Sequence, residues 1–336
     1  MPHLRRSAEV FPGLLLSAAV GLAAAGFEWT EARLFGYIYL DGLVVAILAG
    51  TLLHTVFGLN ERFAAGVRFS AKTVLEIAIV LLGGTISAAT IASSGLPLVA
   101  TIVAIVAVSL MASYAIGRLL GLDDRLATLV SCGNSICGNS AIMAAAPAVD
   151  AQSDEVAASI GFTAVLGIAV VVLLPFCFTL FGLTEWQYGV VAGLSVYAVP
   201  QVLAATVPVG PVSAQIGTIV KLVRVLMLGP VVLVVGLRHG RRSDARLPVS
   251  LLVPWFIVGF IALMAARTSA ILPDGAVGPL HLASSGLTLV AMAALGLSVD
   301  LRSVLASGGR VLAAGASSIV VLVTLAMLAA IFLPIS

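Results

Sequence analysis

Long runs of apolar residues, separated by short polar stretches, cover almost the whole chain. A run of about 20 apolar residues is long enough to cross a bilayer as a helix. We find eleven such runs, over residues 11–27, 37–58, 72–92, 96–120, 125–148, 155–182, 187–208, 213–237, 249–271, 280–299 and 308–335. The pattern predicts an all-α polytopic membrane protein with about eleven transmembrane helices. A transmembrane β-barrel would instead show short segments of alternating polarity.

The composition supports this class of protein. Only 10% of the 336 residues are charged, whereas a soluble domain carries about 25%. The formal net charge of +2 provides no basic surface for nucleic acid. Cys132, Cys137 and Cys177 all lie inside apolar runs, so no disulfide framework is expected. We therefore exclude an ordinary soluble enzyme and expect the lipid bilayer as a partner.

The arginines predict an orientation when they are assigned to alternating sides of the membrane. Twelve fall on one side: Arg5, Arg6, Arg62, Arg68, Arg118, Arg125, Arg238, Arg241, Arg242, Arg246, Arg302 and Arg310. Only Arg33 and Arg267 fall on the other. By the positive-inside rule we expect a multi-pass protein of the bacterial inner (plasma) membrane, with the N-terminus in the cytoplasm and the C-terminus outside.

The first apolar run has two interpretations. It is short, follows Arg5 and Arg6 and ends in small residues, which is also the pattern of a cleaved signal peptide. We favour a membrane-spanning helix within an N-terminal segment over residues 1–36. The orientation of the other ten helices is the same in either case.

A weak internal repeat appears when the chain is shifted by about 146 residues. Leu82-Gly83 then meets Leu228-Gly229, and the glycine-rich stretch 133–140 meets Ser284-Ser285-Gly286 at 279–286. Repeat one would span residues 37–182 and repeat two 183–336. Five crossings per copy is an odd number, so the copies would be inverted. Chance alignment of glycine-containing helices is the alternative.

The run over 125–148 contains a tandem in which Cys-Gly-Asn-Ser recurs after five residues, from Cys132 to Ser140. Glycine disfavours a helix, and Asn and Ser compete for backbone hydrogen bonds. Interrupted backbone at membrane depth is tolerated only beside protein or a water-filled cavity. We therefore predict a broken helix whose second half begins near Gly138 to Ser140, with Asn139 or Ser140 as N-cap. Its free amides would face an anion; close helix packing through small residues is the alternative.

A second irregularity lies in the run over 187–208, where Pro200 follows Tyr197 and precedes Gln201. Proline removes a backbone donor and kinks a helix, and Gln201 needs a partner in the interior. This segment is either a second part of the site or a kink that touches no substrate.

Two cations lie deep in the run over 213–237. Lys221 and Arg224 are three residues apart and so share a helical face. Charged residues at this depth pair with other charges or face a cavity. Glu76 could compensate one of them, with Lys72 one turn before it, which would leave one positive charge for a ligand. A closed ion network that binds nothing is the alternative.

Other residues carry weaker signals. His281 could take up a proton during transport, although an interfacial role is commoner. The sequence contains no phosphate-binding loop, zinc motif or nucleophile elbow. We therefore expect neither enzymatic activity nor a cofactor or metal.

Several of these motifs together resemble the YeiH-type sulfate exporter family. The most specific are Gly133 to Ile142, Gly193 to Ala205 and Lys221 to Pro230, with Ala293 to Leu297 as weaker support. The resemblance implies a fold distantly like the bile-acid symporters and Na⁺/H⁺ antiporters, with two five-helix inverted repeats and a pair of crossing broken helices. This chain differs where many members have a histidine and an acid, since it has Tyr197 and Val199-Pro200 there.

We therefore expect a secondary transporter of a small anion, either sulfate, another oxyanion or an organic acid, that works by alternating access. The predicted binding residues are Asn134, Ser135, Gly138, Asn139, Ser140, Tyr197, Gln201, Lys221, Arg224, Ser284, Ser285 and Gly286. The alternatives are a passive anion channel, an importer coupled to H⁺ or Na⁺, and a membrane enzyme that uses Cys132 or Cys137. The family also suggests a homodimer.

Overall fold

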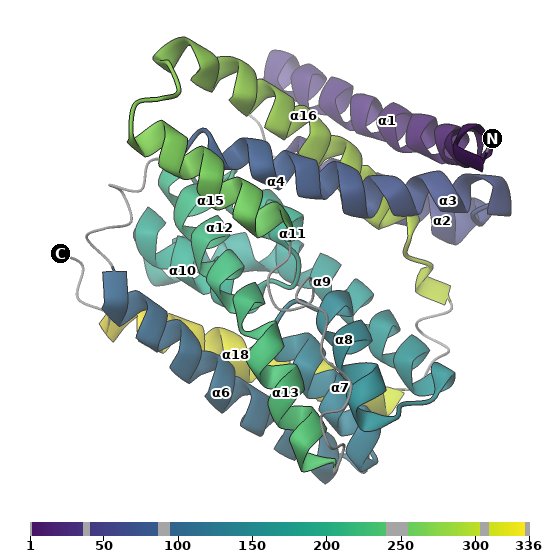
Figure 1. Ribbon diagram of the computed structural model, residues 1–336, viewed down its shortest axis with the longest axis vertical. Helices are drawn as coiled ribbons and strands as arrows, with labels where there is room; N and C mark the ends of the chain where they lie inside the picture. Colours follow the sequence, from purple (N-terminus) through teal and green to yellow (C-terminus); the bar gives the residue numbers. More distant parts are fainter. Residues whose placement is uncertain (1, 36–40, 87–94, 240–254, 303–308, 333–336) are drawn as a thin grey trace. The chain divides into compact units, whose positions relative to one another are not determined.

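The computed structural model is helical throughout its regular elements. It describes residues 2–35, 41–86, 95–239, 255–302 and 309–332 (Figure 1). Within these ranges there is no strand, so the predicted all-α class is confirmed. The helices form two compact units. Arg241, Arg242 and Arg246, which contribute to the predicted orientation, lie outside the described residues.

Six of the described helices are long and apolar enough to cross a membrane. They cover Glu9–Phe35, Pro97–Leu119, Ser153–Phe181, Pro211–Arg238, Asp274–Leu297 and Gly309–Phe332. Three shorter apolar helices cover Gly42–Phe57, Asn139–Val149 and Trp255–Thr268. The predicted transmembrane character is therefore confirmed, whereas the count of eleven and the inverted repeat stay predictions.

Unit one contains the N-terminal helices and two later ones. Its elements are α1 (Pro2–Phe35), α2 (Gly42–Phe57), α3 (Glu61–Phe69), the π-helical turn η1 (Ser70–Val74), α4 (Leu75–Gly83), α15 (Trp255–Thr268, in this unit from Phe256) and α16 (Asp274–Leu297). Helix α16 packs against α2, α4 and α1, and α1 also packs against α3. The first apolar run is thus one continuous helix within a packed unit.

Local sequence explains where the unit-one helices begin and how closely they pack. The Asp41 side chain accepts a hydrogen bond from the Leu43 amide at 2.8 Å, and Asn60 caps α3 in the same way. Helices α2 and α16 cross at Gly50 and Gly296, where a side chain on Gly50 would lie 2.8 Å from the Leu297 nitrogen. Small residues allow such close approach of helices in membranes.

Unit two contains the two interrupted helices and the helices around them. Its elements are α6 (Gly95–Leu119), α7 (Asp124–Ser135), α8 (Asn139–Val149), α9 (Ser153–Phe181), α10 (Glu185–Ser195), α11 (Val199–Thr206), α12 (Pro211–Leu226), α13 (Leu228–Arg238) and α18 (Gly309–Phe332). Helices α6 and α18 lie side by side (Figure 1), and α10 packs against α12 and α18.

Close packing of α10 on α12 positions the later functional residues. A Cβ atom on Gly193 would lie 2.6 Å from the Gly217 carbonyl oxygen and 2.7 Å from the Val220 Cβ. Only glycine allows this distance, which brings the face of α12 that carries Lys221 and Arg224 to the end of α10.

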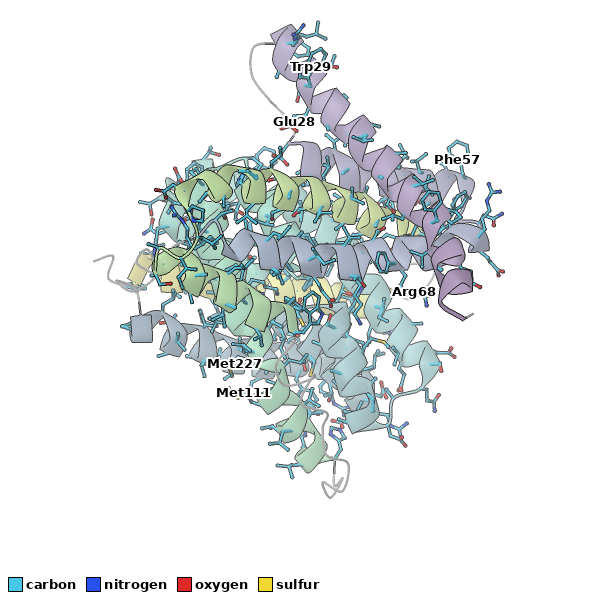
Figure 2. All side chains as sticks on the ribbon, turned by 45° about the horizontal axis from the view of Figure 1, so that its top comes forward. Glu28, Trp29, Phe57, Arg68, Met111 and Met227 are labelled. Atoms are coloured by element: carbon cyan, nitrogen blue, oxygen red, sulfur yellow. The ribbon has the colours of Figure 1, made fainter. Side chains whose placement is uncertain are left out.

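Large apolar side chains on the outside of each unit are typical of a protein that contacts lipid. Phe57 on α2 and Met111 on α6 project outward (Figure 2) and are 81% and 65% exposed. Buried polar groups, in contrast, are concentrated in unit two around the helix interruptions.

The repeat alignment predicts a counterpart of the 133–140 break at Ser284 to Gly286, and this prediction is wrong. Residues Ser284, Ser285 and Gly286 lie in the middle of α16, which is a continuous helix from Asp274 to Leu297. The Ser284 hydroxyl donates to the Ala78 carbonyl at 2.8 Å, while Ser285 and Gly286 are exposed. A single glycine costs a helix only about 1 kcal/mol relative to alanine, which packing of α16 offsets.

Candidate functional site

The first helix interruption lies where the sequence predicts it. Helix α7 ends at Ser135 and α8 begins at Asn139. The N-cap of α8 is Gly138, one residue before the predicted cap, and its φ of +66° and ψ of −125° suit glycine alone. The Ala141 and Ile142 amides both donate to the Gly138 carbonyl, at 3.0 and 3.1 Å. The predicted broken helix is thus confirmed.

A second interruption lies between α10 and α11, at residues 196–198. Sequence reasoning expects only a kink here. Pro200 instead occupies the first turn of a new helix, where its missing N–H costs nothing. The Ala198 amide donates to the Gln201 side-chain oxygen at 3.2 Å, so Gln201 finds its partner in the loop itself. These two interruptions both lie in unit two.

Lys221 and Arg224 hold the two interruptions together. The Lys221 Nζ donates to the carbonyls of Ile136 at 2.5 Å and Val196 at 2.9 Å. The Arg224 guanidinium donates to Ser135 at 2.7 Å and Asn134 at 2.6 Å, and also to Val196 at 3.1 Å and Gly193 at 3.4 Å. Both cations have no exposed surface.

These hydrogen bonds compensate the C-terminal ends of α7 and α10. The last carbonyls of a helix have no partner within the helix, and they carry the negative end of its dipole. In α7 the Cys132 and Gly133 carbonyls accept the amides of Ile136 and Gly138. The next three carbonyls, at 134–136, accept hydrogen bonds from Lys221 and Arg224. Two buried charges thus satisfy backbone groups that the interruptions set free.

The predicted compensation of Lys221 or Arg224 by Glu76 stays a prediction, since Glu76 lies in unit one and both cations lie in unit two. All six hydrogen bonds of Lys221 and Arg224 within the described ranges go to backbone carbonyls. Five carbonyls from two helix ends converge on these cations. The network with Lys72, which is exposed on η1, is untested.

The N-terminal end of α8 is accessible, in contrast to the buried C-terminal ends. Asn139 and Ser140 are exposed, whereas Asn134 and Ser135 have no exposed surface. Thr163 on α9 donates its hydroxyl to the Asn139 side-chain oxygen at 2.5 Å. Since that oxygen is occupied, the side-chain NH₂ group of Asn139 is the part available to an acceptor.

Buried polar atoms beside the first interruption lack partners. The Tyr197 hydroxyl donates to the Asn134 side-chain oxygen at 2.7 Å and so links the two interruptions. The Asn134 Nδ2 atom and the hydroxyl of Ser135 are buried with no protein partner among the described residues. Unpaired buried donors are costly and commonly mark a bound water or ligand.

The residues predicted for binding, charge compensation and proton coupling therefore separate into two groups. One group lies around the interruptions in unit two: Asn134, Ser135, Gly138, Asn139, Ser140, Tyr197, Gln201, Lys221 and Arg224. The other lies in unit one: Ser284, Ser285, Gly286, Lys72, Glu76 and His281. His281 is exposed on α16, and its role in proton coupling stays a prediction.

Sequence reasoning missed two features of unit two. Thr163 is one; a hydroxyl within the apolar run 155–182 is the available signal. The other is a polar cluster at the start of α7. Asp124 accepts hydrogen bonds from Tyr114 at 2.5 Å, Arg238 at 3.1 Å and His239 at 2.7 Å.

Asp124 precedes the predicted membrane span at 125–148 and is partly exposed. The Tyr114 hydrogen bond, followed by those from His239 and the charge of Arg238, holds the pKa of Asp124 below its ordinary value of 3.8, against a smaller opposing effect of burial.

No group of three His, Cys, Asp or Glu side chains within the described ranges is placed to hold a metal ion. Cys132 is buried in α7, and Cys137 lies partly exposed in the first interruption. Neither has a hydrogen-bonded histidine or carboxylate of the kind that activates a thiol, as far as the described residues go.

Comparison with known proteins gives consistent matches. A family model described as Conserved hypothetical protein 698 matches residues 12–315. The chain is 52% identical to the UPF0324 membrane protein Atu0671 of Agrobacterium fabrum, over 95% of this chain and 92% of that protein. It is 51% identical to the UPF0324 membrane protein blr3189 of Bradyrhizobium diazoefficiens over the same shares. A UPF0324 membrane protein of Bacillus cereus is 32% identical over 81% of each chain. No solved structure matches.

Proposed function

This chain belongs to the UPF0324 family of membrane proteins, and on that premise we propose that it is a secondary transporter of a small anion. The names of its relatives state a membrane protein and no substrate, so the substrate class rests on the site. Sulfate, another oxyanion or a small organic acid is the proposed substrate, and alternating access is the proposed mechanism.

One observation carries this proposal: two broken helices meet in unit two with their C-terminal carbonyls already compensated by buried cations. Broken helices with bound ions near the bilayer midplane are typical of secondary transporters. The two cations have no carboxylate partner among the described residues, which leaves the region positive. A positive, donor-rich region favours an anion.

The N-terminal end of α8 provides the donors. The first amides of a helix have no intrahelical partner and lie at the positive end of its dipole. Exposed Asn139 and Ser140 add a side-chain NH₂ group and a hydroxyl. We place the anion beside these groups, with Asn134 Nδ2 and the Ser135 hydroxyl as buried donors behind them. Lys221 and Arg224 then act through charge, not through direct contact.

Proteoliposomes that contain the purified protein test the proposal. We expect saturable uptake of labelled sulfate, and at least a tenfold lower kcat/KM for the Asn139→Ala variant. The matched control is Asn60→Ala, since Asn60 is also an exposed asparagine at the start of a helix, in unit one. Equal uptake by Asn139→Ala and Asn60→Ala would refute the site, and uptake no faster than in empty liposomes, for sulfate and a panel of organic acids, would refute the function.

Two alternatives are separated by the same preparation. A passive channel would not drive labelled sulfate against its gradient when unlabelled sulfate leaves the vesicle, whereas a carrier exchanges the two. A thiol-dependent membrane enzyme requires Cys132 or Cys137, so we expect the double substitution by serine to retain uptake.

We propose the inner-membrane location with a cytoplasmic N-terminus on the basis of the arginine distribution. A cysteine introduced at Arg310 and labelled from one side of the membrane tests this orientation.

A further inference from the structure

The ends of α7 and α10 form a cluster of backbone carbonyls deep in unit two. Five carbonyl oxygens, from Asn134, Ser135, Ile136, Gly193 and Val196, lie within 3.4 Å of a nitrogen of Lys221 or Arg224. The residues that supply them are buried.

Such a cluster has the chemistry of a cation site. Neutral oxygens from interrupted backbone and from half-helix C-terminal ends are the groups that coordinate Na⁺ in carriers with broken helices. Two helix ends that point at one region also place two negative dipole ends together, and this arrangement requires a positive charge. In this chain α12 supplies that charge from its own side chains.

We propose that Lys221 and Arg224 occupy the place of a coupling metal cation, so that this protein carries its anion without Na⁺. The inference rests on the proposed function, because it names the ion that the carrier does not need. It also predicts, independently of transport, that the folded protein is not stabilised by a soluble cation at this cluster. The carbonyl cluster is already satisfied, and a soluble cation gains no contacts there.

The geometry explains why both side chains are needed. The Lys221 ammonium is compact and bridges one carbonyl from each interruption, Ile136 and Val196. The planar Arg224 guanidinium reaches Asn134 and Ser135 on one side and Gly193 and Val196 on the other. Each cation therefore joins both helix ends.

Thermal unfolding in detergent tests, without any transport assay, whether Na⁺ stabilises the folded protein. Wild-type protein is compared in NaCl, KCl and choline chloride at equal ionic strength. We expect the same Tm, within about 1 °C, in all three salts, because a ligand that binds only the folded state would raise Tm. A Tm several degrees higher in NaCl than in choline chloride would overturn the proposal.

A truncation of the lysine sharpens the test. Lys221→Ala removes the ammonium and leaves space beside the Ile136 and Val196 carbonyls. We expect this variant to be unstable in choline chloride. It should regain a cooperative unfolding transition in NaCl or methylammonium chloride, because their cations are small enough to enter the vacated space. A folded Lys221→Ala protein with no response to either cation would overturn the proposal. If the variant folds in no salt, the wild-type measurement decides.

The chain offers a matched control, because Lys72 is its other lysine and is exposed on η1. Lys72→Ala should show no difference in Tm between the salts.

In proteoliposomes, replacement of Na⁺ by choline should change the initial rate of labelled sulfate uptake by wild-type protein less than twofold. A tenfold loss of uptake without Na⁺ would overturn the inference while supporting the proposed carrier. No uptake in any salt counts against the carrier, and the unfolding data then decide the inference alone.

Discussion

The segments Cys132 to Ala141 and Ser284 to Gly286 both place glycine and small polar residues inside an apolar run, yet only the first interrupts its helix. The difference lies in what surrounds the backbone. At the first segment two cations donate hydrogen bonds to the freed carbonyls. At the second, Ser284 and Thr288 bond to carbonyls of α4 and α16, and the helix continues.

The comparison shows that weak helix propensity alone does not break a helix within a membrane protein. Each freed carbonyl or amide needs a partner, because there is no water in hydrocarbon to replace it. A break is therefore stable only where the rest of the fold brings charge or polar side chains to the helix ends.

The largest effect is expected from Arg224→Met. It removes four hydrogen bonds to the ends of α7 and α10 and leaves buried carbonyls without a partner. We expect the free energy of unfolding to fall by about 3–5 kcal/mol, measured by denaturant titration in detergent. The control is Arg68→Met, on the exposed part of α3, which should cost about 0.5 kcal/mol or less. Equal losses for the two variants would mean that the hydrogen bonds of Arg224 to the carbonyl cluster do not stabilise the fold.

Glycine replacement should give effects of opposite sign at the two segments. In Gly138→Ala the new methyl group would lie 3.2 Å from the Tyr197 Cβ, and the φ of +66° is strained for alanine. We expect a loss of about 1–3 kcal/mol. In Gly286→Ala the methyl group would meet no atom within 4 Å, so a gain of about 0.5–1 kcal/mol is expected. Unfolding midpoints of the two variants measure this, and the same sign at both positions would contradict the comparison.

Loss of one hydroxyl should be felt more at the interruption than in the continuous helix. Tyr197→Phe removes the donor to the Asn134 side-chain oxygen and leaves a buried acceptor unpaired, at a cost of about 1–3 kcal/mol. Ser284→Ala removes a bond to the Ala78 carbonyl, for which we expect about 0.5–1.5 kcal/mol. Denaturant titrations of both variants give the order, and a larger loss for Ser284→Ala would reverse it.

The smallest effect is expected at the Asp124 cluster, where charges are paired near the surface. The folded-state pKa of Asp124 lies below its ordinary 3.8, so the ionised carboxylate stabilises the fold above that pH. This contribution should be lost as the pH falls through the lowered folded-state pKa. Tyr114→Phe removes its main cause and should cost under about 1 kcal/mol at pH 7. The difference from wild type should shrink at low pH, and a difference that grows there would show that another group is responsible.

Much of the fold follows from the sequence because hydrophobic runs have a direct physical meaning in a bilayer. The all-helical class and the interruption from Ser135 to Asn139 are predicted correctly. Both depend on local information, namely run length and the density of Gly and Asn. Local information also explains the caps at Asp41 and Asn60.

The rest of the site depends on contacts between distant residues. Proline at position 200 is read as a kink, although it is also compatible with a new helix start. The partners of Lys221 lie 85 and 25 residues away and are backbone groups, which leave no side-chain signature. Carboxylates such as Glu76 are visible in a sequence, whereas free carbonyls appear only once two helices end side by side.

Because both counter-charges extend from one stretch of α12, they couple three segments mechanically. Separating α12 from either half-helix would strip an ammonium or guanidinium of its acceptors in an environment without water. The interruptions and α12 should therefore move together as one rigid body in any rearrangement of unit two. Flexing must then be confined to segments beyond this trio, where no buried charge is exposed by motion.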